Sequence, residues 1–116
     1  MISFEPTEEQ ELVRTTVREF AAQSLRGAAR EADEASTLPG SFLAEAASLG
    51  LTASQISESH GGGGMRSPLT NALVLEELGY GDAALGAAAT AAAPFAMAIA
   101  DAGTEEQKRR FLPLFA

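Results

Sequence analysis

The chain has 116 residues, 46% of them hydrophobic, which suits one compact domain over residues 1–116 and leaves no room for a second full domain. Sixteen acidic against eight basic residues give a net charge of −8, which opposes binding to nucleic acid and to anionic membrane surfaces. The absence of cysteine excludes disulfides and thiolate metal sites, and the small number of aromatic residues leaves alanine and leucine to build the core, which favours closely packed helices.

The start M-I-S-F-E-P-T-E-E-Q has neither the basic nor the apolar region of a signal peptide, so we expect a cytoplasmic location.

The N-terminal segment is predicted to form a long amphipathic helix. Thr7 and Gln10 have the spacing of a capping box. Apolar residues then recur with a period of about 3.6 as far as about residue 33, while Arg14 and Arg18 lie mostly off this stripe. The stripe consists of Leu12, Val13, Val17, Phe20, Ala21, Ala28 and Ala32.

A short helix is predicted between two breaks. Leu38-Pro39-Gly40 interrupts the chain, and Ser41 is placed to cap the next helix. Gly50 can end that helix in the left-handed conformation. Residues 51–66 are then expected to form an irregular connection, with at most a short extended piece at 51–56.

Two further helix starts follow in the second half of the chain. Ser67 with Pro68 has the pattern of a cap followed by proline at the first helical position. This helix is expected to reach Gly79 or Gly81, because glycine is common just past a helix end. Asp82 is placed to cap the helix after it.

The segment 82–102 contains twelve alanines in twenty-one residues and no charge between its end aspartates. Its length raises the question of a membrane span, but alanine is only weakly apolar and no basic or aromatic belt flanks the segment. We therefore expect a buried helix in a soluble protein and no membrane span. Pro94 should kink this helix and free the carbonyl of Thr90.

The C-terminal segment repeats the signals of the first helix start. Gly103 suits the position just past a helix end, and Thr104 with Gln107 forms a second T-E-E-Q capping box. An apolar ending follows, made of Phe111, Leu112, Leu114 and Phe115. Because no segment alternates with period two for long enough to form a sheet, the predicted fold is all-α, an orthogonal or up-down bundle of about five helices.

The polar, charged and glycine-rich positions that could take part in catalysis or ligand binding indicate no catalytic residue and no metal site. His60 is the only histidine and is expected to be solvated. The run Gly61–Gly64 lacks the strand and the Lys-Ser/Thr of a phosphate loop, so it is interpreted as a flexible turn, with close approach to a ligand as the alternative. Glu76-Glu77 and Glu105-Glu106 are expected on solvated faces or at a helix start, because neighbours on a helix diverge by about 100°. Lys108-Arg109-Arg110 is expected to form surface ion pairs, with a phosphate contact as the alternative.

Five segments stand in the chain in a recognisable order. They are T-E-E-Q-E-L-V-R-T-T-V-R-E-F-A at 7–21, L-G-L at 49–51, S-E-S-H-G-G-G-G-M at 57–65, A-L-V-L-E-E-L-G-Y-G-D at 72–82 and A-G-T-E-E-Q-K-R-R-F-L-P at 102–113. Together they resemble the N-terminal helical domain of the acyl-CoA dehydrogenase family, over essentially the whole chain. In one departure, S-E-S-H-G-G-G-G replaces the more usual P-E-E-Y-G-G-L-G and removes a rigid proline and an aromatic contact.

The resemblance implies a flavoprotein in which a middle β-domain and a second helical domain, both absent from this sequence, accompany this domain. Such proteins usually assemble as tetramers and bind FAD mainly through the two other domains. In the family, a glutamate removes the α-proton of the acyl thioester while the β-hydride passes to the flavin N5. That base usually lies in the second helical domain, so the resemblance implies no catalytic residue here and leaves any cofactor-binding residues of this chain unknown.

The resemblance also implies that the helix over 82–102 forms one wall of the acyl pocket. The pocket-facing positions correspond to Gly86, Ala87 and Thr90, with Ala91 and Pro94 one turn further along. These small residues suggest a roomy pocket for a long or bulky acyl group. Close helix packing is the alternative explanation of the same residues.

The function expected from the resemblance is that of the N-terminal domain of an FAD-dependent acyl-CoA dehydrogenase, which introduces an α,β double bond into an acyl-CoA. The isolated chain is expected to be inactive. Two alternatives stay open: the same domain of a related flavin oxidase or monooxygenase, and a stand-alone helical interaction module.

Overall fold

The computed structural model describes residues 5–116. The first four residues, which belong to the segment compared above with a signal peptide, lie outside this range. All regular secondary structure in the described residues is helical, which confirms the predicted all-α class. The chain forms two compact units, which are described separately. The first comprises the described residues up to Pro39 together with Pro68–Ala87, and the second comprises Gly40–Ser67 and Ala88–Ala116.

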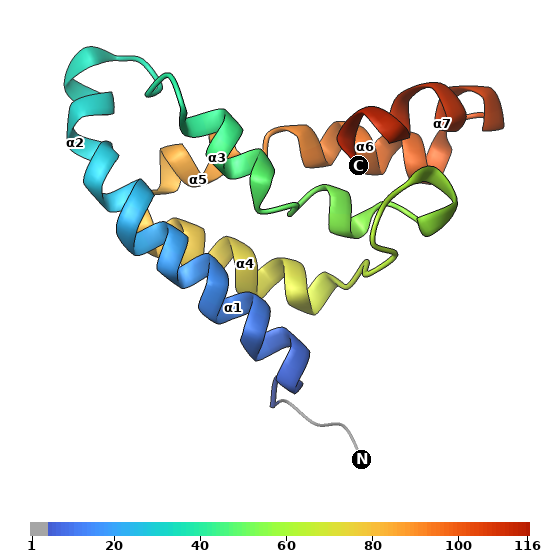
Figure 1. Ribbon diagram of the computed structural model, residues 1–116, viewed down its shortest axis with the longest axis horizontal. Coiled ribbons are helices and arrows are strands. Elements are labelled where there is room, and N and C mark those ends of the chain that lie inside the picture. Colours follow the sequence, from blue (N-terminus) through green and yellow to red (C-terminus); the bar gives the residue numbers. More distant parts are fainter. Residues whose placement is uncertain (1–4) are drawn as a thin grey trace. The chain divides into compact units, whose positions relative to one another are not determined.

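The predicted N-terminal helix is present as one helical rod with a wider turn in its middle (Figure 1). Helix α1 (Glu8–Phe20) passes through a π-helical turn (Ala21–Leu25) into α2 (Arg26–Ala35). The rod ends close to the predicted residue 33. Its last turn closes on Ser36, which adopts the left-handed conformation with φ of 53°.

Both predicted capping boxes are present. The Gln10 N–H donates to Thr7 Oγ1 over 3.2 Å, and the Thr7 N–H donates to Gln10 Oε1 over 2.9 Å. The Gln107 N–H donates to Thr104 Oγ1 over 3.2 Å, and the Thr104 N–H donates to Gln107 Oε1 over 2.8 Å. Each box satisfies two N–H groups that have no partner within their helix, so the repeated tetrapeptide fixes two helix starts in the same way.

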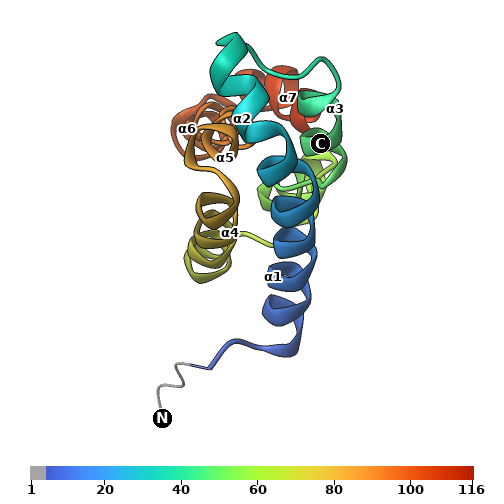
Figure 2. The same ribbon diagram turned by 90° about the vertical axis from the view of Figure 1, so that its left-hand side faces the viewer.

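Helix α4 (Pro68–Gly81) lies beside α1 in both views (Figures 1 and 2). The two approach closely where Gly81 meets the π-helical turn, because a methyl group on Gly81 would lie 2.8 Å from the Ala21 Cβ and 3.1 Å from the Ala21 carbonyl oxygen. A larger residue would therefore force the helices apart. The buried apolar residues of this first unit are Val17, Ala21, Leu25, Val74, Leu78 and Leu85.

The predicted cap at Asp82 is confirmed. Its Oδ1 accepts a hydrogen bond of 2.8 Å from the N–H of Leu85 in the first turn of α5 (Ala83–Ala89). Because an aspartate at this position satisfies an N–H that has no partner within the helix, it stabilises the start of a helix made almost entirely of alanine. Helix α4 therefore ends and α5 begins around one capping residue.

The prediction of a single kinked helix over 82–102 is wrong, because the structure has two helices there. Helix α5 ends at Ala89, and α6 (Ala92–Ala102) begins two residues before Pro94. The carbonyl of Thr90, expected to be free, accepts a hydrogen bond of 3.0 Å from the N–H of Ala93. Proline is tolerated in the first turn of a helix, where its missing N–H costs no hydrogen bond, so the chain starts a new helix instead of bending the old one.

Helix α3 (Phe42–Ser48) begins the second unit and buries Phe42 and Ala46. The predicted cap at Ser41 is wrong, because this residue has helical backbone angles and its side chain makes no capping bond. A capping residue needs an extended backbone to aim its oxygen at the helix N–H groups. Gly50 follows the helix with φ of 65°, which is the predicted left-handed conformation.

The connection over 51–66 contains two 3₁₀ turns, Ala53–Gln55 and Glu58–His60, in place of the short extended piece allowed at 51–56. The Ser54 N–H donates to the Gly50 carbonyl over 2.8 Å. Such short-range hydrogen bonds satisfy the backbone locally, so the segment needs no neighbouring strand.

The second unit is completed by α7 (Glu105–Phe111) and a 3₁₀ turn over Leu112–Phe115. Between α6 and α7, Gly103 occupies the predicted position but is extended, with φ of −71°. A methyl group there would lie 2.5 Å from the Ile99 carbonyl oxygen, which explains the glycine by close approach. The buried core of this unit contains Ile56, Ala96 and Leu112, with Met97, Ile99, Ala100 and Phe115 packed against it.

Within the described residues, no single helix is both long and apolar enough to cross a membrane. Helices α5 and α6 reach the required length and composition only when they are taken together across their break.

Candidate functional site

The five residues predicted to line an acyl pocket fall in both units, and their environments differ. Gly86 is buried, and a methyl group on it would lie 3.0 Å from the Cβ of Leu78 in α4. The small size of Gly86 therefore allows α5 to approach α4. Ala87, the next residue, is exposed. In the second unit, Thr90 is half-buried, and Ala91 and Pro94 are exposed.

A cavity of about 630 Å³ lies in the second unit, and Ala91 is the one predicted pocket residue among those that line it. Thr52 supplies the one polar side chain of its lining. Such a surface can bury an alkyl chain but offers no acid or base. The other lining residues are Leu43, Ala46, Ala47, Gly50, Leu51, Ala53, Ala88, Ala89, Ala92, Leu114, Phe115 and Ala116.

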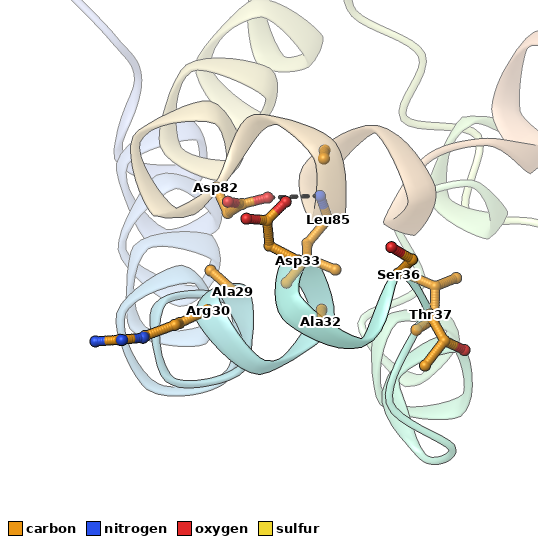
Figure 3. Close-up of a pocket in the computed structure, with 10 residues that line it drawn as sticks. Ala29, Arg30, Ala32, Asp33, Ser36, Thr37, Asp82 and Leu85 are labelled. Carbon is orange, nitrogen blue, oxygen red and sulfur yellow. Dashed lines mark hydrogen bonds between the residues drawn. The ribbon is translucent and has the colours of Figure 1, made fainter.

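A second cavity, of about 750 Å³, lies in the first unit and is more polar (Figure 3). Asp33, Ser36 and Thr37 line it together with Asp82, whose carboxylate is held by the Leu85 N–H. None of the five predicted pocket residues belongs to this lining. Across the part of the chain that the structure describes, no three histidine, aspartate or glutamate side chains are grouped so that they could hold a metal ion.

The run Gly61–Gly64 forms the expected turn, and its N–H groups are engaged by carbonyls of the preceding residues. The N–H groups of Gly61, Gly62, Gly63 and Gly64 donate to the carbonyls of Glu58, Ser57, Ala53 and Ile56 over 2.8–3.1 Å. A methyl group on Gly62 would lie 2.2 Å from the Ile56 carbonyl oxygen. The glycines therefore allow close approach of backbone to backbone, and their N–H groups are already engaged, unlike those of a phosphate loop.

His60 is half-buried and hydrogen-bonded, which corrects the expectation that it is simply solvated. Its Nδ1 lies 2.8 Å from Ser57 Oγ and 3.2 Å from Ser59 Oγ. Ser59 belongs to the same 3₁₀ turn as His60 and Ser57 directly precedes it, so the cluster organises the loop locally.

Glu77 is the polar residue that sequence reasoning placed wrongly. It was expected on a solvated face, but its side chain is only 4% exposed and contacts α1. Arg18 donates to it from Nη2 over 2.6 Å and from Nε over 2.9 Å, and Arg14 donates from Nε over 2.8 Å. Hydrogen bonds from Arg18 and Arg14 lower the pKa of Glu77 to about 2, although burial alone raises the pKa of a carboxyl group.

A signal for this cluster was present in the sequence. Glu77 shares a helix face with Val74, Leu78 and Gly81, at the spacing of a packed surface. A charge on such a face needs a partner on the neighbouring helix, because burying an unpaired carboxylate is costly.

The surface ion pairing expected of Lys108-Arg109-Arg110 is confirmed for Lys108, whereas the two arginines have other partners. Lys108 Nζ lies 3.0 Å from Glu105 Oε1, and Arg109 Nε donates to the Glu105 carbonyl over 3.3 Å. The Arg110 guanidinium stacks over the Phe111 ring at 5.1 Å from its centroid. Glu105 and Glu106 are exposed at the start of α7, where negative charge favours a helix N-terminus.

Comparison with known proteins identifies the class to which this helical chain belongs. The sequence profile of the acyl-CoA dehydrogenase N-terminal domain matches residues 7–116. The chain therefore belongs to the acyl-CoA dehydrogenase family, and the matched part corresponds to its N-terminal domain.

Three curated relatives are named after different acyl groups. A probable medium-chain specific acyl-CoA dehydrogenase 2 (mitochondrial) of Caenorhabditis briggsae is 32% identical over 99% of this chain and 28% of its own length. A short-chain specific acyl-CoA dehydrogenase of Clostridium acetobutylicum is 34% identical over 96% of this chain and 29% of its own length. A mitochondrial isobutyryl-CoA dehydrogenase of Dictyostelium discoideum is 31% identical over 92% of this chain and 26% of its own length.

The chain thus spans between 26% and 29% of the length of these relatives. Because similar identities are found to proteins named for medium-chain, short-chain and isobutyryl groups, the likeness of this domain assigns no acyl group to the chain.

Proposed function

We propose that residues 1–116 act as the N-terminal domain of an FAD-dependent acyl-CoA dehydrogenase and form one wall of the pocket for the acyl group. The observation that carries this proposal is the family match over residues 7–116. The α,β-desaturation of an acyl-CoA is proposed for a longer polypeptide that contains this chain, because the chain spans less than a third of its relatives.

FAD and the catalytic glutamate are proposed to belong mainly to the middle β-domain and the second helical domain, as the family resemblance implies. The described residues give no reason to place flavin phosphates at Gly61–Gly64, because all four N–H groups of that run donate to backbone carbonyls. The isolated chain is accordingly proposed to be inactive. What it contributes is apolar surface and rigid support for the acyl chain.

The proposed wall consists of the five positions that the family resemblance implies, which are Gly86, Ala87, Thr90, Ala91 and Pro94. Gly86 also lets α5 approach α4. The exposed Ala87 and the place of Ala91 in an almost wholly apolar cavity support these assignments, since an alkyl chain gains free energy by leaving water for such a surface. Small side chains leave space, so a long or bulky acyl group is the proposed substrate.

Translating the reading frame beyond residue 116 and purifying the complete product test the proposal. The expected product has a β-domain and a second helical domain, contains flavin, and loses its visible flavin absorbance when an acyl-CoA is added. A product without a flavin domain would favour the stand-alone interaction module, and hydrogen peroxide formed in stoichiometric yield would favour the oxidase alternative. Either outcome contradicts the proposed dehydrogenase.

Substitution in the wall tests the pocket assignment within that complete product. Ala91→Phe should shift the preferred acyl-CoA to a shorter chain, because the ring fills space otherwise open to the substrate. Ala98→Phe, at an exposed position of α6, is the matched control and should leave the chain-length profile unchanged. A wild-type preference confined to short chains would contradict the roomy pocket.

For the complete protein we also propose a homotetramer in the cytoplasm. The family resemblance supports the tetramer. Light scattering of the purified protein and cell fractionation test these two proposals. Two of the relatives above are named as mitochondrial, so fractionation is the decisive measurement for the compartment.

A further inference from the structure

We propose that Glu77 is a positioning residue for the acyl-pocket wall, holding α4 against α1 so that the first turns of α5 are fixed through Leu78. This inference rests on the proposed function, because it gives the buried ion cluster a role in placing Gly86 and Ala87. All of these residues belong to the first compact unit.

The first step is the attachment of α4 to α1. Arg14 and Arg18 stand one turn apart on α1 and converge on the one carboxylate of Glu77, with three donor–acceptor distances between 2.6 and 2.9 Å. Arg18 contacts both carboxylate oxygens, so this pair restricts the rotation of α4 as well as its position along α1. Arg14 Nη1 also donates to Glu11 Oε1 on the same helix over 3.4 Å.

The second step leads from α4 to α5. Leu78 directly follows Glu77 and is 1% exposed. A methyl group on Gly86 would lie 3.0 Å from the Leu78 Cβ and 3.3 Å from its carbonyl oxygen, so α5 rests on Leu78 with no space between them. A shift of Leu78 cannot be absorbed by a gap and must move the backbone at Gly86.

Backbone hydrogen bonds also join α4 to α5. The Leu78 carbonyl accepts from the Asp82 N–H over 3.0 Å, and the Asp82 carbonyl accepts from the Gly86 N–H over 2.8 Å. The Asp82 side chain also holds the Leu85 N–H over 2.8 Å. A continuous series of bonds therefore joins the residue after Glu77 to the residue before Ala87.

A charged residue fixes the position of α4 on α1 better than an apolar residue of similar size. Buried ion pairs gain little net stability, because removing charges from water offsets their attraction, but their directional bonds select one arrangement of helices. Apolar contacts are non-directional, whereas two guanidinium groups that share one carboxylate bond it only in a defined arrangement of the two helices. The position of α4 is thus set at Glu77, within the same helix face as the apolar contacts.

Amide hydrogen exchange on the 116-residue chain tests the coupling without any substrate. Glu77→Gln should accelerate exchange of the Leu85 and Gly86 amides about tenfold more than exchange at Val17 in α1, because the start of α5 loosens before the unit opens. The matched control is Glu76→Gln, which alters the exposed neighbouring carboxylate and should leave all these rates unchanged. Equal acceleration at all three amides would mean general destabilisation and would overturn the proposal.

If the Glu77→Gln variant does not fold, hydrogen exchange in the Arg14→Lys variant tests the same proposal. Lysine retains the charge but loses the donation from Arg14 Nε. The same selective acceleration at Leu85 and Gly86 is expected, with a smaller amplitude. Unchanged exchange at both amides would contradict the positioning role.

The complete enzyme supplies a second and separate readout. Glu77→Gln should raise KM for the preferred acyl-CoA severalfold with little change in kcat, because it displaces a binding surface and no reacting group. If Ala87→Leu changes the chain-length profile while Glu77→Gln leaves KM unchanged, the positioning role is wrong. If Ala87→Leu changes nothing, the pocket assignment of Ala87 fails, and hydrogen exchange still decides whether Glu77 fixes α5.

Discussion

Each of the two compact units of this chain is stabilised by a different kind of internal contact. In the first, long helices meet through side chains, and the interface of α1 with α4 combines an apolar core with the carboxylate of Glu77 shared by two arginines. In the second, short helices pack against Ile56 of a connection that closes on itself through backbone hydrogen bonds, with glycines at the points of closest approach. Long helices offer many side-chain contacts, whereas a short irregular segment must satisfy its backbone first.

The comparison shows that similar local signals support different tertiary solutions. The same T-E-E-Q capping box starts α1 in the first unit and α7 in the second. After the first capping box, the thirteen residues of α1 provide a surface for α4. After the second capping box, the seven residues of α7 lead into a 3₁₀ turn whose Leu112 joins a small core. Helix length and tertiary partners, rather than the cap, decide how each unit is stabilised.

The largest effect is expected where the second unit depends on its backbone. Gly62→Ala places a methyl group 2.2 Å from the Ile56 carbonyl oxygen and 2.6 Å from that of Ala53. Backbone atoms cannot yield as a flexible side chain can, so the free energy of unfolding should fall by roughly 4 kcal/mol. Urea denaturation measures the change. Gly40→Ala, with open space around the new methyl group, should change stability by less than about 0.5 kcal/mol.

Truncating the apolar core of the second unit should cost slightly less. Leu112→Ala removes a side chain that is 1% exposed, and the loss of burial together with the cavity should lower the free energy of unfolding by about 3 kcal/mol. Leu114→Ala, at a residue 74% exposed, is the control two positions along and should change it by less than about 0.5 kcal/mol. Equal losses in thermal unfolding would show that Leu112 lies outside the core.

The charge cluster of the first unit should contribute a smaller amount. Glu77→Gln keeps the shape but leaves two guanidinium groups without their negative partner, and because water can reach these arginines the loss should be about 2 kcal/mol. Chemical denaturation compares it with Glu76→Gln, whose carboxylate is exposed. A similar loss for both variants would show that charge in general, rather than the cluster, stabilises this unit.

Acid should remove the contribution of Glu77 in a defined range of pH. Because the pKa of Glu77 is about 2 in the folded chain and near the ordinary 4.5 in the unfolded chain, the unfolded state binds the proton first. The stabilisation is present above pH 4.5 and is lost as the pH falls towards 2. The difference in unfolding free energy between wild type and Glu77→Gln should therefore shrink across this range. A constant difference would contradict the assigned ion cluster.

The smallest effect should have the opposite sign. Gly27 lies within α2, and a methyl group there would meet nothing within 4 Å. Gly27→Ala should therefore stabilise the chain by about 0.5–1 kcal/mol, because alanine restricts the unfolded chain and favours the helix. Thermal unfolding measures the gain. A loss of stability would mean that the π-helical turn beside it needs the freedom of glycine.

Features that depend on neighbouring residues were predictable from the sequence. The caps at Thr7, Asp82 and Thr104 are formed by contacts three residues apart, and the left-handed Gly50 follows from the chemistry of one residue. The family pattern likewise indicated the whole all-α chain in advance. For these features, no knowledge of distant contacts is required.

Features that depend on distant partners were missed or misplaced. Glu77 was placed in solvent because its arginine partners lie about sixty residues earlier in the chain. For Gly86 the sequence left a pocket and close helix packing as two explanations, because the contact with Leu78 can be found only in the folded chain. The hydrogen bonds of the glycine run were missed because the carbonyls that accept from Gly63 and Gly64 lie up to ten residues away. The proposed acyl-binding role of Ala87, Thr90, Ala91 and Pro94 depends on the acyl chain itself, which neither sequence nor packing supplies.

The central claim, that this domain forms one wall of an acyl pocket, is tested most directly by photo-crosslinking in the complete protein. An acyl-CoA with a photoreactive group at the far end of its acyl chain is bound and irradiated, and the labelled peptides are identified by mass spectrometry. The account predicts label between Ala87 and Pro94, reduced by competition with unlabelled acyl-CoA. Labelling confined to peptides outside residues 1–116, with equally efficient capture, would contradict it.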